Sequence, residues 1–141
     1  MKKAIVKITD RHFQDGEEAC AELTTMGTLE FTEKGFIITY EETGEELVGC
    51  TTKLFVEGDE RISMTRTGSF NTDLIIEKDR RHTCFYSTPY GELIMGVFGK
   101  SIIPAMTENG GSLKFRYTLD FNSTPASENE LEITVAVKEE Q

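Results

Sequence analysis

A strict alternation of apolar and polar side chains recurs along most of this chain, and it constrains the fold more than any other feature of the sequence. Between Leu113 and Phe121, apolar and aromatic residues alternate with lysine, arginine, threonine and aspartate, and segments 19–32, 36–41 and 131–137 repeat the pattern. Because successive side chains of a β-strand point to opposite faces, this two-residue period indicates strands with one buried face. β-Branched and aromatic residues, which favour a pleated surface, fill these runs.

Turn signals rich in glycine, asparagine, aspartate and proline separate the alternating runs at short intervals. Two segments stay open: residues 15–23 could begin with a helical turn, and residues 100–106, which contain Pro104, could be an edge strand or a loop. The turns divide the chain into about ten predicted strands, near 2–9, 19–32, 35–42, 47–57, 61–67, 70–77, 82–88, 92–100, 112–121 and 130–138.

Strands joined by such short turns pair with their sequence neighbours and form an antiparallel meander. A meander of this size has two exposed edges unless it closes into a barrel. The 141 residues contain no internal repeat and no linker, so we expect one domain over residues 1–141. The sequence therefore predicts an all-β protein, a single antiparallel up-and-down β-barrel of about eight to ten strands.

The stretch HTCFYSTPYGELIMGV, residues 82–97, gathers a histidine, a cysteine and two tyrosines. Proline and glycine around Tyr90 supply the dihedral angles of a tight turn, so we interpret the stretch as a hairpin whose tyrosines alternate for packing. The alternative is a thiol–imidazole pair, because His82 and Cys84 share one strand face. Nothing in the sequence supplies a third group to orient that pair.

The same hairpin carries a resemblance to a known family. Residues 86–93, YSTPYGEL, resemble a hairpin motif of the YwiB-like proteins, an uncharacterised bacterial family. The resemblance implies a calycin-type β-barrel of lipocalin-like shape, and it implies no catalytic residue because the family has no established activity. True lipocalins usually show a Gly-x-Trp motif near the first strand, and this chain has no tryptophan. Four further stretches resemble the family in the same order: GFIITYEE (35–42), ISMTRTGSF (62–70), GGSLKFRYTLDF (110–121) and ENELEITVAV (128–137).

The formal charge of −10 disfavours nucleic acids and anionic membranes as partners, because both attract basic proteins. Only three apolar residues follow Lys2 and Lys3 before Lys7, too few for a secretory signal, so we expect a cytoplasmic protein. The three cysteines are far apart and form no C-x-x-C pair, and the two histidines are distant in sequence. We therefore expect no metal site and no cofactor.

Two charged residues fall in phase with apolar neighbours and are therefore predicted to point into the barrel. Arg66 follows the parity of Ile62 and Met64, and Glu42 that of Phe36 and Ile38. A buried charge needs a partner, so we expect an internal Glu42–Arg66 ion pair. We expect the neighbours of this pair to come from Tyr40, Tyr86 and Tyr117. The pair is either a polar handle for a ligand carboxylate or phosphate, or a structural ion pair near the barrel mouth.

Barrels of this size can hold one small ligand, so the favoured function is a cytoplasmic protein that binds a small molecule inside the barrel or at its mouth. The alternative is a protein–protein interaction module whose barrel is filled by side chains. A polar cavity around Arg66 would favour the first, and an apolar band on the outer surface would favour the second. Enzyme activity is the third choice, and the sequence indicates no oligomeric state.

Overall fold

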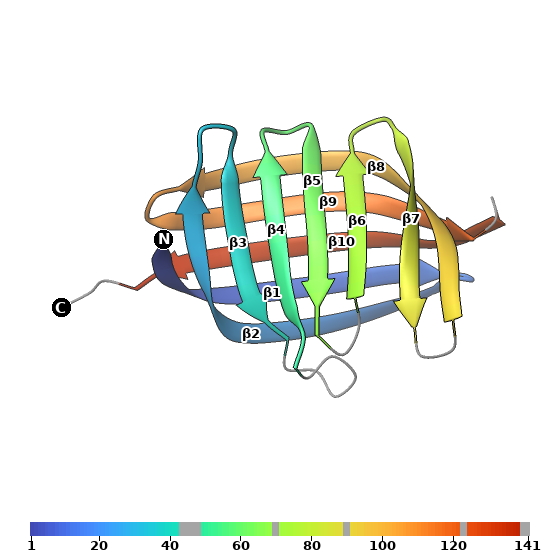
Figure 1. Ribbon diagram of the computed structural model, residues 1–141, viewed down its shortest axis with the longest axis horizontal. Coiled ribbons are helices and arrows are strands. Elements are labelled where there is room, and N and C mark those ends of the chain that lie inside the picture. Colours follow the sequence, from blue (N-terminus) through green and yellow to red (C-terminus); the bar gives the residue numbers. More distant parts are fainter. Residues whose placement is uncertain (43–48, 69–70, 89–90, 122–123, 139–141) are drawn as a thin grey trace.

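The computed structural model describes residues 1–42, 49–68, 71–88, 91–121 and 124–138, without the side chains of residues 86–88, 93 and 125–126. The described residues contain ten β-strands (Figure 1). Their bounds are β1 Lys2–Gln14, β2 Glu17–Phe31, β3 Phe36–Glu41, β4 Thr51–Glu57, β5 Arg61–Thr67, β6 Asn71–Glu77, β7 Arg81–Thr88, β8 Gly91–Thr107, β9 Gly110–Phe121 and β10 Thr124–Val137.

Every strand pairs antiparallel with its sequence neighbours, and β1 also pairs with β10, which closes the barrel. This arrangement confirms the predicted up-and-down β-barrel. The short strands β3 to β7 form one wall and cross the long strands β8, β9, β10, β1 and β2 of the other wall (Figure 1). β2 can approach β3 closely because residue 27 is glycine. A Cβ atom at Gly27 would lie 2.2 Å from the carbonyl oxygen of Thr39.

The interior of the barrel is filled by stacked rows of apolar side chains. Each row runs across β3, β4, β5 and β6, whose even-numbered residues lie directly opposite one another. From the long strands, Val6, Phe115 and Ile133 are fully buried against these rows. We call the rows the apolar layers; the first contains Phe36, Val56, Ile62 and Ile76, and the second Ile38, Leu54, Met64 and Leu74.

Residues 15–23 contain no helical turn, so that part of the prediction was wrong. Gln14 pairs with Glu17, which leaves Asp15 and Gly16 as a two-residue hairpin loop. Both have positive φ, 52° and 76°, as a type I′ turn requires. Asp-Gly between two alternating runs is a strong local hairpin signal, and it was present in the sequence.

Residues 100–106 are not a loop but continue β8 to Thr107, so the edge-strand alternative was correct. Beyond a register shift at Gly99–Ser101, residues 101–107 of β8 pair with β9 alone. Pro104, which has no N–H to donate, is opposite Leu113 in this part of the ladder. A proline is tolerated there because only one side of the strand is paired.

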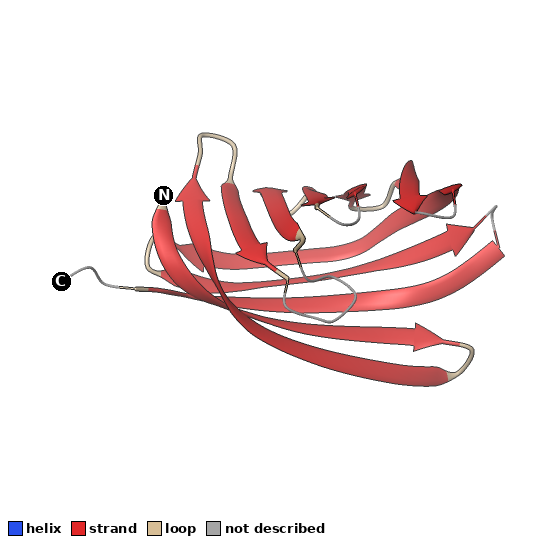
Figure 2. Cartoon of the chain, turned by 60° about the horizontal axis from the view of Figure 1, so that its bottom comes forward, coloured by secondary structure: helices blue, strands red, loops and turns tan. Residues whose placement is uncertain are grey.

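The far half of the β1–β2 hairpin, residues 11–22, is exposed on both faces. The sequence alternation had indicated a buried face that includes Ala19 and Ala21, but both residues are exposed. β1 stays paired with β10 as far as Phe13, but β2 pairs with β3 only at residues 27–31, and toward its free end the hairpin lies away from the short strands (Figure 2). Alternation correctly predicted the strand, but not whether anything covers it.

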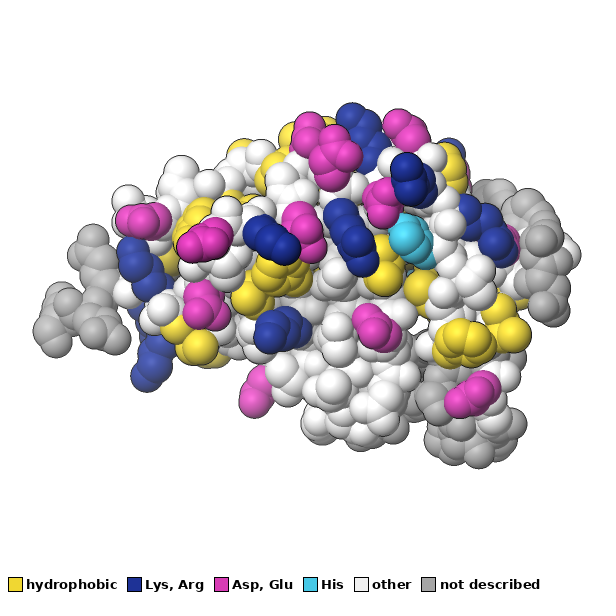
Figure 3. All heavy atoms as spheres, turned by 45° about the horizontal axis from the view of Figure 1, so that its top comes forward, with side chains coloured by type: hydrophobic (Ala, Val, Ile, Leu, Met, Phe, Trp, Pro, Cys, Tyr) yellow, Lys and Arg dark blue, Asp and Glu magenta, His cyan; other side chains and the backbone are white. Residues whose placement is uncertain are grey.

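Charged side chains of both signs are interspersed on the face shown in Figure 3, where hydrophobic side chains form only small groups. All three cysteines are free thiols; Cys20 is exposed, whereas Cys50 and Cys84 are buried. Among the described residues, no helix has the length and apolar character needed to cross a membrane.

Candidate functional site at the barrel mouth

Next to the apolar layers, the inner face of the short strands becomes polar within a single step of the ladder. Tyr40 is opposite Thr52, Thr52 opposite Arg66, Arg66 opposite Thr72, and Thr72 opposite Tyr86. These five residues form one row across five adjacent strands, which we call the polar row. The strand pleat places the four members of the row on β3 to β6 on the same face as the apolar layers, so they cover one end of the core.

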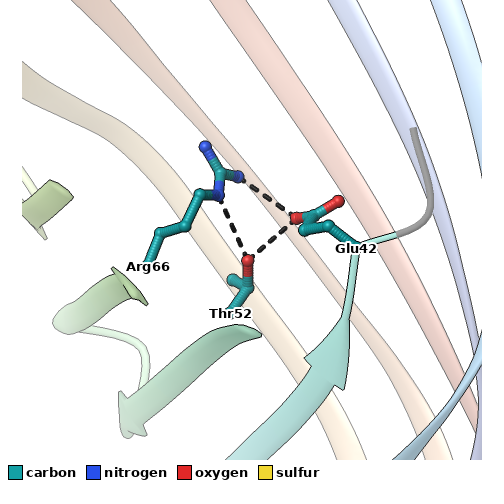
Figure 4. Close-up of polar contacts among 3 residues, drawn as sticks. All are labelled: Glu42, Thr52 and Arg66. Carbon is teal, nitrogen blue, oxygen red and sulfur yellow. Dashed lines mark hydrogen bonds and ion pairs between the residues drawn. The ribbon is translucent and has the colours of Figure 1, made fainter. Parts of the chain in front are cut away.

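The predicted ion pair between Glu42 and Arg66 is present at this row, and Thr52 links its two members (Figure 4). Arg66 Nη2 donates to Glu42 Oε1 at 3.2 Å, and Arg66 Nε donates to Thr52 Oγ1 at 3.3 Å. Thr52 Oγ1 in turn donates to the same carboxylate oxygen at 2.8 Å. The hydroxyl therefore holds both charged groups in a fixed orientation.

The position of Glu42 is set by the backbone just beyond the end of β3. Its N–H donates to the carbonyl oxygen of Cys50 at 2.9 Å, which continues the β3–β4 pairing past Glu41. The Glu42 side chain is 9% exposed and that of Arg66 22% exposed, while Thr52 is fully buried. Two charges this deep are tolerated because each compensates the other and both are hydrogen-bonded.

Two of the three predicted tyrosines have hydroxyl groups within the electrostatic reach of this pair. Burial raises the pKa of Tyr40, and the carboxylate of Glu42 raises it further. Burial likewise raises the pKa of Tyr117 on β9, with a smaller contribution from Asp10. Both phenols are therefore neutral at physiological pH. For Tyr86, the backbone pairs with Thr72 and Leu93, and its side chain lies outside the described residues.

Sequence reasoning missed a second polar group, which β1 and β10 bring to the same place. Asp10 follows the inward parity of Val6 and Ile8, which is the same signal that identified Glu42. His12 Nδ1 is 3.0 Å from Asn129 Oδ1 and 3.4 Å from Asp10 Oδ1. Because both neighbours are oxygen acceptors, Nδ1 carries the proton and the other ring nitrogen points away from them.

The Asp10 carboxyl is held at an energetic cost. Its Oδ1 atom is buried and makes no hydrogen bond to any described residue. Burial raises the pKa of Asp10; His12 and Arg66 act to lower it, whereas Glu42 raises it. The charges of Arg66 and Glu42 therefore act on Asp10, although the three residues come from different parts of the chain. We call the whole group the polar mouth: the polar row together with Asp10, His12, Glu42, Tyr117 and Asn129.

The structure does not support the thiol–imidazole alternative at His82 and Cys84. His82 Nε2 is 3.1 Å from Glu77 Oε1, a carboxylate that could orient the ring, but the Cys84 thiol interacts with the backbone of Ile75. Burial raises the pKa of the Cys84 thiol, whereas a reactive cysteine needs a lowered one. Among the described residues, no group of three or more His, Cys, Asp or Glu side chains could hold a metal ion.

A shallow groove of about 430 Å³ is lined by residues of β1 to β4, and Tyr40 of the polar row is among them. Its side chains include Met26, Lys3 and Glu41, which have outward parity. The two charges have opposite sign, and the remaining polar lining residues are threonines and Tyr40. This groove therefore lacks the convergent charged groups that distinguish the polar mouth.

Comparisons with known proteins identify a family and one similar solved structure. Residues 6–133 match the family model described as a domain of unknown function, DUF1934. The fold is similar to the crystal structure of the ywiB protein from Bacillus subtilis, with a TM-score of 0.87 and 17% sequence identity over 98% of this chain and 93% of that chain. A search of the curated proteins found no significant match.

Proposed function

The chain belongs to the DUF1934 family, and from that premise we propose that it binds a small polar molecule at the mouth of its barrel. The observation that carries the proposal is the polar mouth itself. Charged and hydroxyl-bearing side chains from β1, β3, β4, β5 and β9 converge there, whereas the layers beside it are apolar. Convergent polar groups on an otherwise apolar scaffold are typical of ligand sites.

The filled core decides where such a ligand would sit. The largest side chains of the apolar layers and their counterparts, such as Leu54 and Phe115, are fully buried and packed together. A ligand is therefore expected beside the polar row and not in the depth of the barrel. The exposed far half of the β1–β2 hairpin supplies an adjacent wall on which a bound molecule could rest.

Energetics argue against a purely structural role for the polar mouth. If these residues only closed the end of the barrel, apolar side chains would stabilise it at least as well. Replacing a buried ion pair by well-packed hydrophobic residues is often neutral or stabilising. Asp10 in particular has a raised pKa and a buried oxygen that makes no hydrogen bond to any described residue. Residues that oppose stability in this way are commonly retained for function.

The proposal is tested by screening a mixture of small metabolites against the isotope-labelled protein by two-dimensional NMR. We expect a binder whose chemical-shift changes gather at Thr52, Arg66 and Thr72. Arg66→Met should raise or lower the affinity of this binder by about tenfold, because the variant removes one charged group from the site. Arg81→Met is the matched control, because Arg81 pairs with Asp120 outside the mouth. Shift changes confined to other surfaces, or equal affinity in Arg66→Met, would contradict the proposal.

A second candidate function has its own observation. Phe85 and Ile94 lie opposite each other on β7 and β8 and are 61% and 52% exposed on the outer face. Such a pair favours the protein-interaction alternative, because large exposed apolar side chains often mark a contact surface. Native mass spectrometry of gently purified protein separates the two: a small added mass supports ligand binding, and a second polypeptide that is lost in Phe85→Ser supports interaction.

The proposed compartment is the cytoplasm. All three cysteines are free thiols, as is usual for proteins of a reducing compartment.

A further inference from the structure

We propose that the open edge of β2, from Glu17 to Met26, docks an extended basic segment of a partner protein by strand addition. In this mode the backbone of the partner pairs with a free sheet edge, and its alternate side chains meet those of the edge strand. The inference concerns the edge of a strand and goes beyond the ligand site proposed at the polar mouth.

The edge is open because β2 is paired on one side only over most of its length. β2 pairs with β1 from Glu17 to Leu29, but with β3 only at residues 27–31. Within the described part of the chain, nothing pairs with the other edge of β2 between Glu17 and Met26. Residues 17–22 are exposed, and here the hairpin lies away from the short strands (Figure 2). A partner strand therefore has access to this edge.

The turn between β2 and β3 shows which backbone groups face the open edge. Just beyond β2, the N–H of Thr32 donates to the carbonyl oxygen of Gly35 at 2.8 Å, so the backbone groups of Thr32 are directed toward the β3 side. Residues of a strand alternate in the side to which they direct these groups, so the even-numbered residues of β2 share this direction. On the open edge these residues are Glu18, Cys20, Glu22 and Thr24.

A second open edge, on β8, is protected against pairing, and the edge of β2 is not. Residues 101–107 of β8 pair with β9 alone, but this edge contains Pro104 and follows Lys100 and a register shift at Gly99–Ser101. Proline, lysine and bulges are devices that keep other strands away from a sheet edge. Residues 17–26 contain no proline, lysine or arginine, and their register with β1 is unbroken. The edge of β2 is therefore suited to accept a strand.

The side chains along this edge select the chemistry of the partner. Glu18 and Glu22 lie on one face of β2, and neither forms an ion pair with any described residue. Basic residues directly opposite them would stabilise the added strand, because opposite charges on facing strands attract. On the other face, the small side chains of Ala19 and Ala21 leave room for larger apolar ones. The favoured segment therefore has a basic residue at each end and apolar residues at the second and fourth positions.

The same glutamates disfavour a second copy of this chain as the occupant. An antiparallel pairing of two β2 edges centred on Cys20 places Glu18 opposite Glu22 of the other copy, and one centred on Glu22 places Glu22 opposite itself. Like charges directly opposite each other destabilise a sheet. The formal charge of −10 on each copy adds a long-range repulsion, whereas it attracts a basic segment.

The test titrates the capped peptide Lys-Val-Thr-Val-Lys into the isotope-labelled full chain at low ionic strength, followed by two-dimensional NMR. We expect shifts of the backbone amide signals of Glu18, Cys20, Glu22 and Thr24. The charge-reversed peptide Glu-Val-Thr-Val-Glu should bind at least about tenfold more weakly. Absence of these shifts at the highest soluble peptide concentration, or equal binding of the two peptides, would overturn the inference.

Two variants at one position test whether the backbone of β2 makes the contact. Cys20→Pro removes an N–H that faces the open edge and leaves the pairing with β1 intact, whereas Cys20→Ser keeps that N–H. We expect Cys20→Pro to abolish binding of the lysine peptide and Cys20→Ser to retain it, with dispersed spectra showing that each variant is folded. Unchanged binding in a folded Cys20→Pro variant would overturn the inference.

A charge variant keeps the test decisive if Cys20→Pro does not fold. Replacing both glutamates, by Glu18→Gln and Glu22→Gln together, should weaken binding of the lysine peptide by at least about tenfold. Glu60→Gln, in the exposed turn between β4 and β5, is the matched control and should leave binding unchanged. Equal weakening in both variants would overturn the inference. Sedimentation of the unmodified protein tests the other occupant: a dimer that is lost in Cys20→Pro would identify a second copy and likewise overturn it.

Discussion

The inner face of β3 to β6 carries two neighbouring regions that differ sharply in chemistry. The second apolar layer contains Ile38, Leu54, Met64 and Leu74, and one pleat further along the same strands lies the polar row. Both regions share backbone geometry, strand pairing and proximity to the long strands. The difference teaches that the pleat only directs side chains inward, and that the identity of the side chain decides whether a position stabilises the fold or presents chemistry.

The comparison is sharpest where a large apolar side chain is removed. Phe115 is fully buried among the apolar layers, so Phe115→Ala should destabilise the protein by about 3–5 kcal/mol through lost transfer energy and the cavity left behind. Urea denaturation measures this. Ile103→Ala, at a position 58% exposed on the outer surface, is the control and should stay within about 0.5 kcal/mol of the parent. A destabilisation below about 3 kcal/mol for Phe115→Ala would show that the barrel is not tightly filled.

Breaking the ion pair of the polar mouth should have the next largest effect. Glu42→Gln leaves the Arg66 charge without its carboxylate, and we expect a loss of about 1–3 kcal/mol, less than for a fully buried pair because Arg66 is 22% exposed. Adding Arg66→Met should recover most of the loss. A double-mutant cycle by chemical denaturation measures the coupling. A coupling near zero would mean that the two residues do not support each other.

Asp10 should behave in the opposite way to a core residue. Its pKa is raised in the folded state, so folding favours the protonated carboxyl. Its contribution to stability therefore falls as pH rises from the unfolded pKa of 3.8 through the raised folded value, and it remains unfavourable above that.

Asp10→Asn removes this cost and should stabilise the protein at neutral pH by up to about 1 kcal/mol. The gain over the parent should disappear in acid, below the unfolded pKa of 3.8. Denaturation of both proteins at neutral and acidic pH checks the sign. If Asp10→Asn were instead less stable at neutral pH, the carboxylate would be a structural partner in the folded protein.

Glu130, on the strand that pairs with β1, gives the smallest effect and the reverse pH dependence. A hydrogen bond from Lys114 at 2.9 Å lowers the pKa of this carboxyl on the outer surface. Its contribution is present above the unfolded pKa of 4.5 and is lost as pH falls through the lowered folded value. Glu130→Gln should cost less than about 0.5 kcal/mol at neutral pH because solvent screens exposed pairs. A cost that survives high salt would contradict this assignment.

Much of the site could be predicted from the sequence by parity alone. Glu42 and Arg66 are charged residues at positions in phase with apolar ones, and that signal correctly indicated a partnered pair inside the barrel. Asp10 carries the same signal after Val6 and Ile8 and could have been identified in the same way. The expected first strand near 2–9 ended before it, whereas β1 runs to Gln14 because of the Asp15–Gly16 turn.

The sequence by itself determined the local structure of this protein: the strands, the hairpin turns, the inward or outward parity of each side chain, and hence the all-β class. These depend on a two-residue period and on turn residues, which act over a few positions. Only the tertiary structure decided that the charges of Glu42 and Arg66 act on Asp10, and that Ala19 and Ala21 remain uncovered. Those facts depend on closure of β1 against β10 and on the course of the β1–β2 hairpin away from the short strands. Both depend on how segments that are distant in the chain are arranged relative to one another, and no local period of the sequence encodes that arrangement.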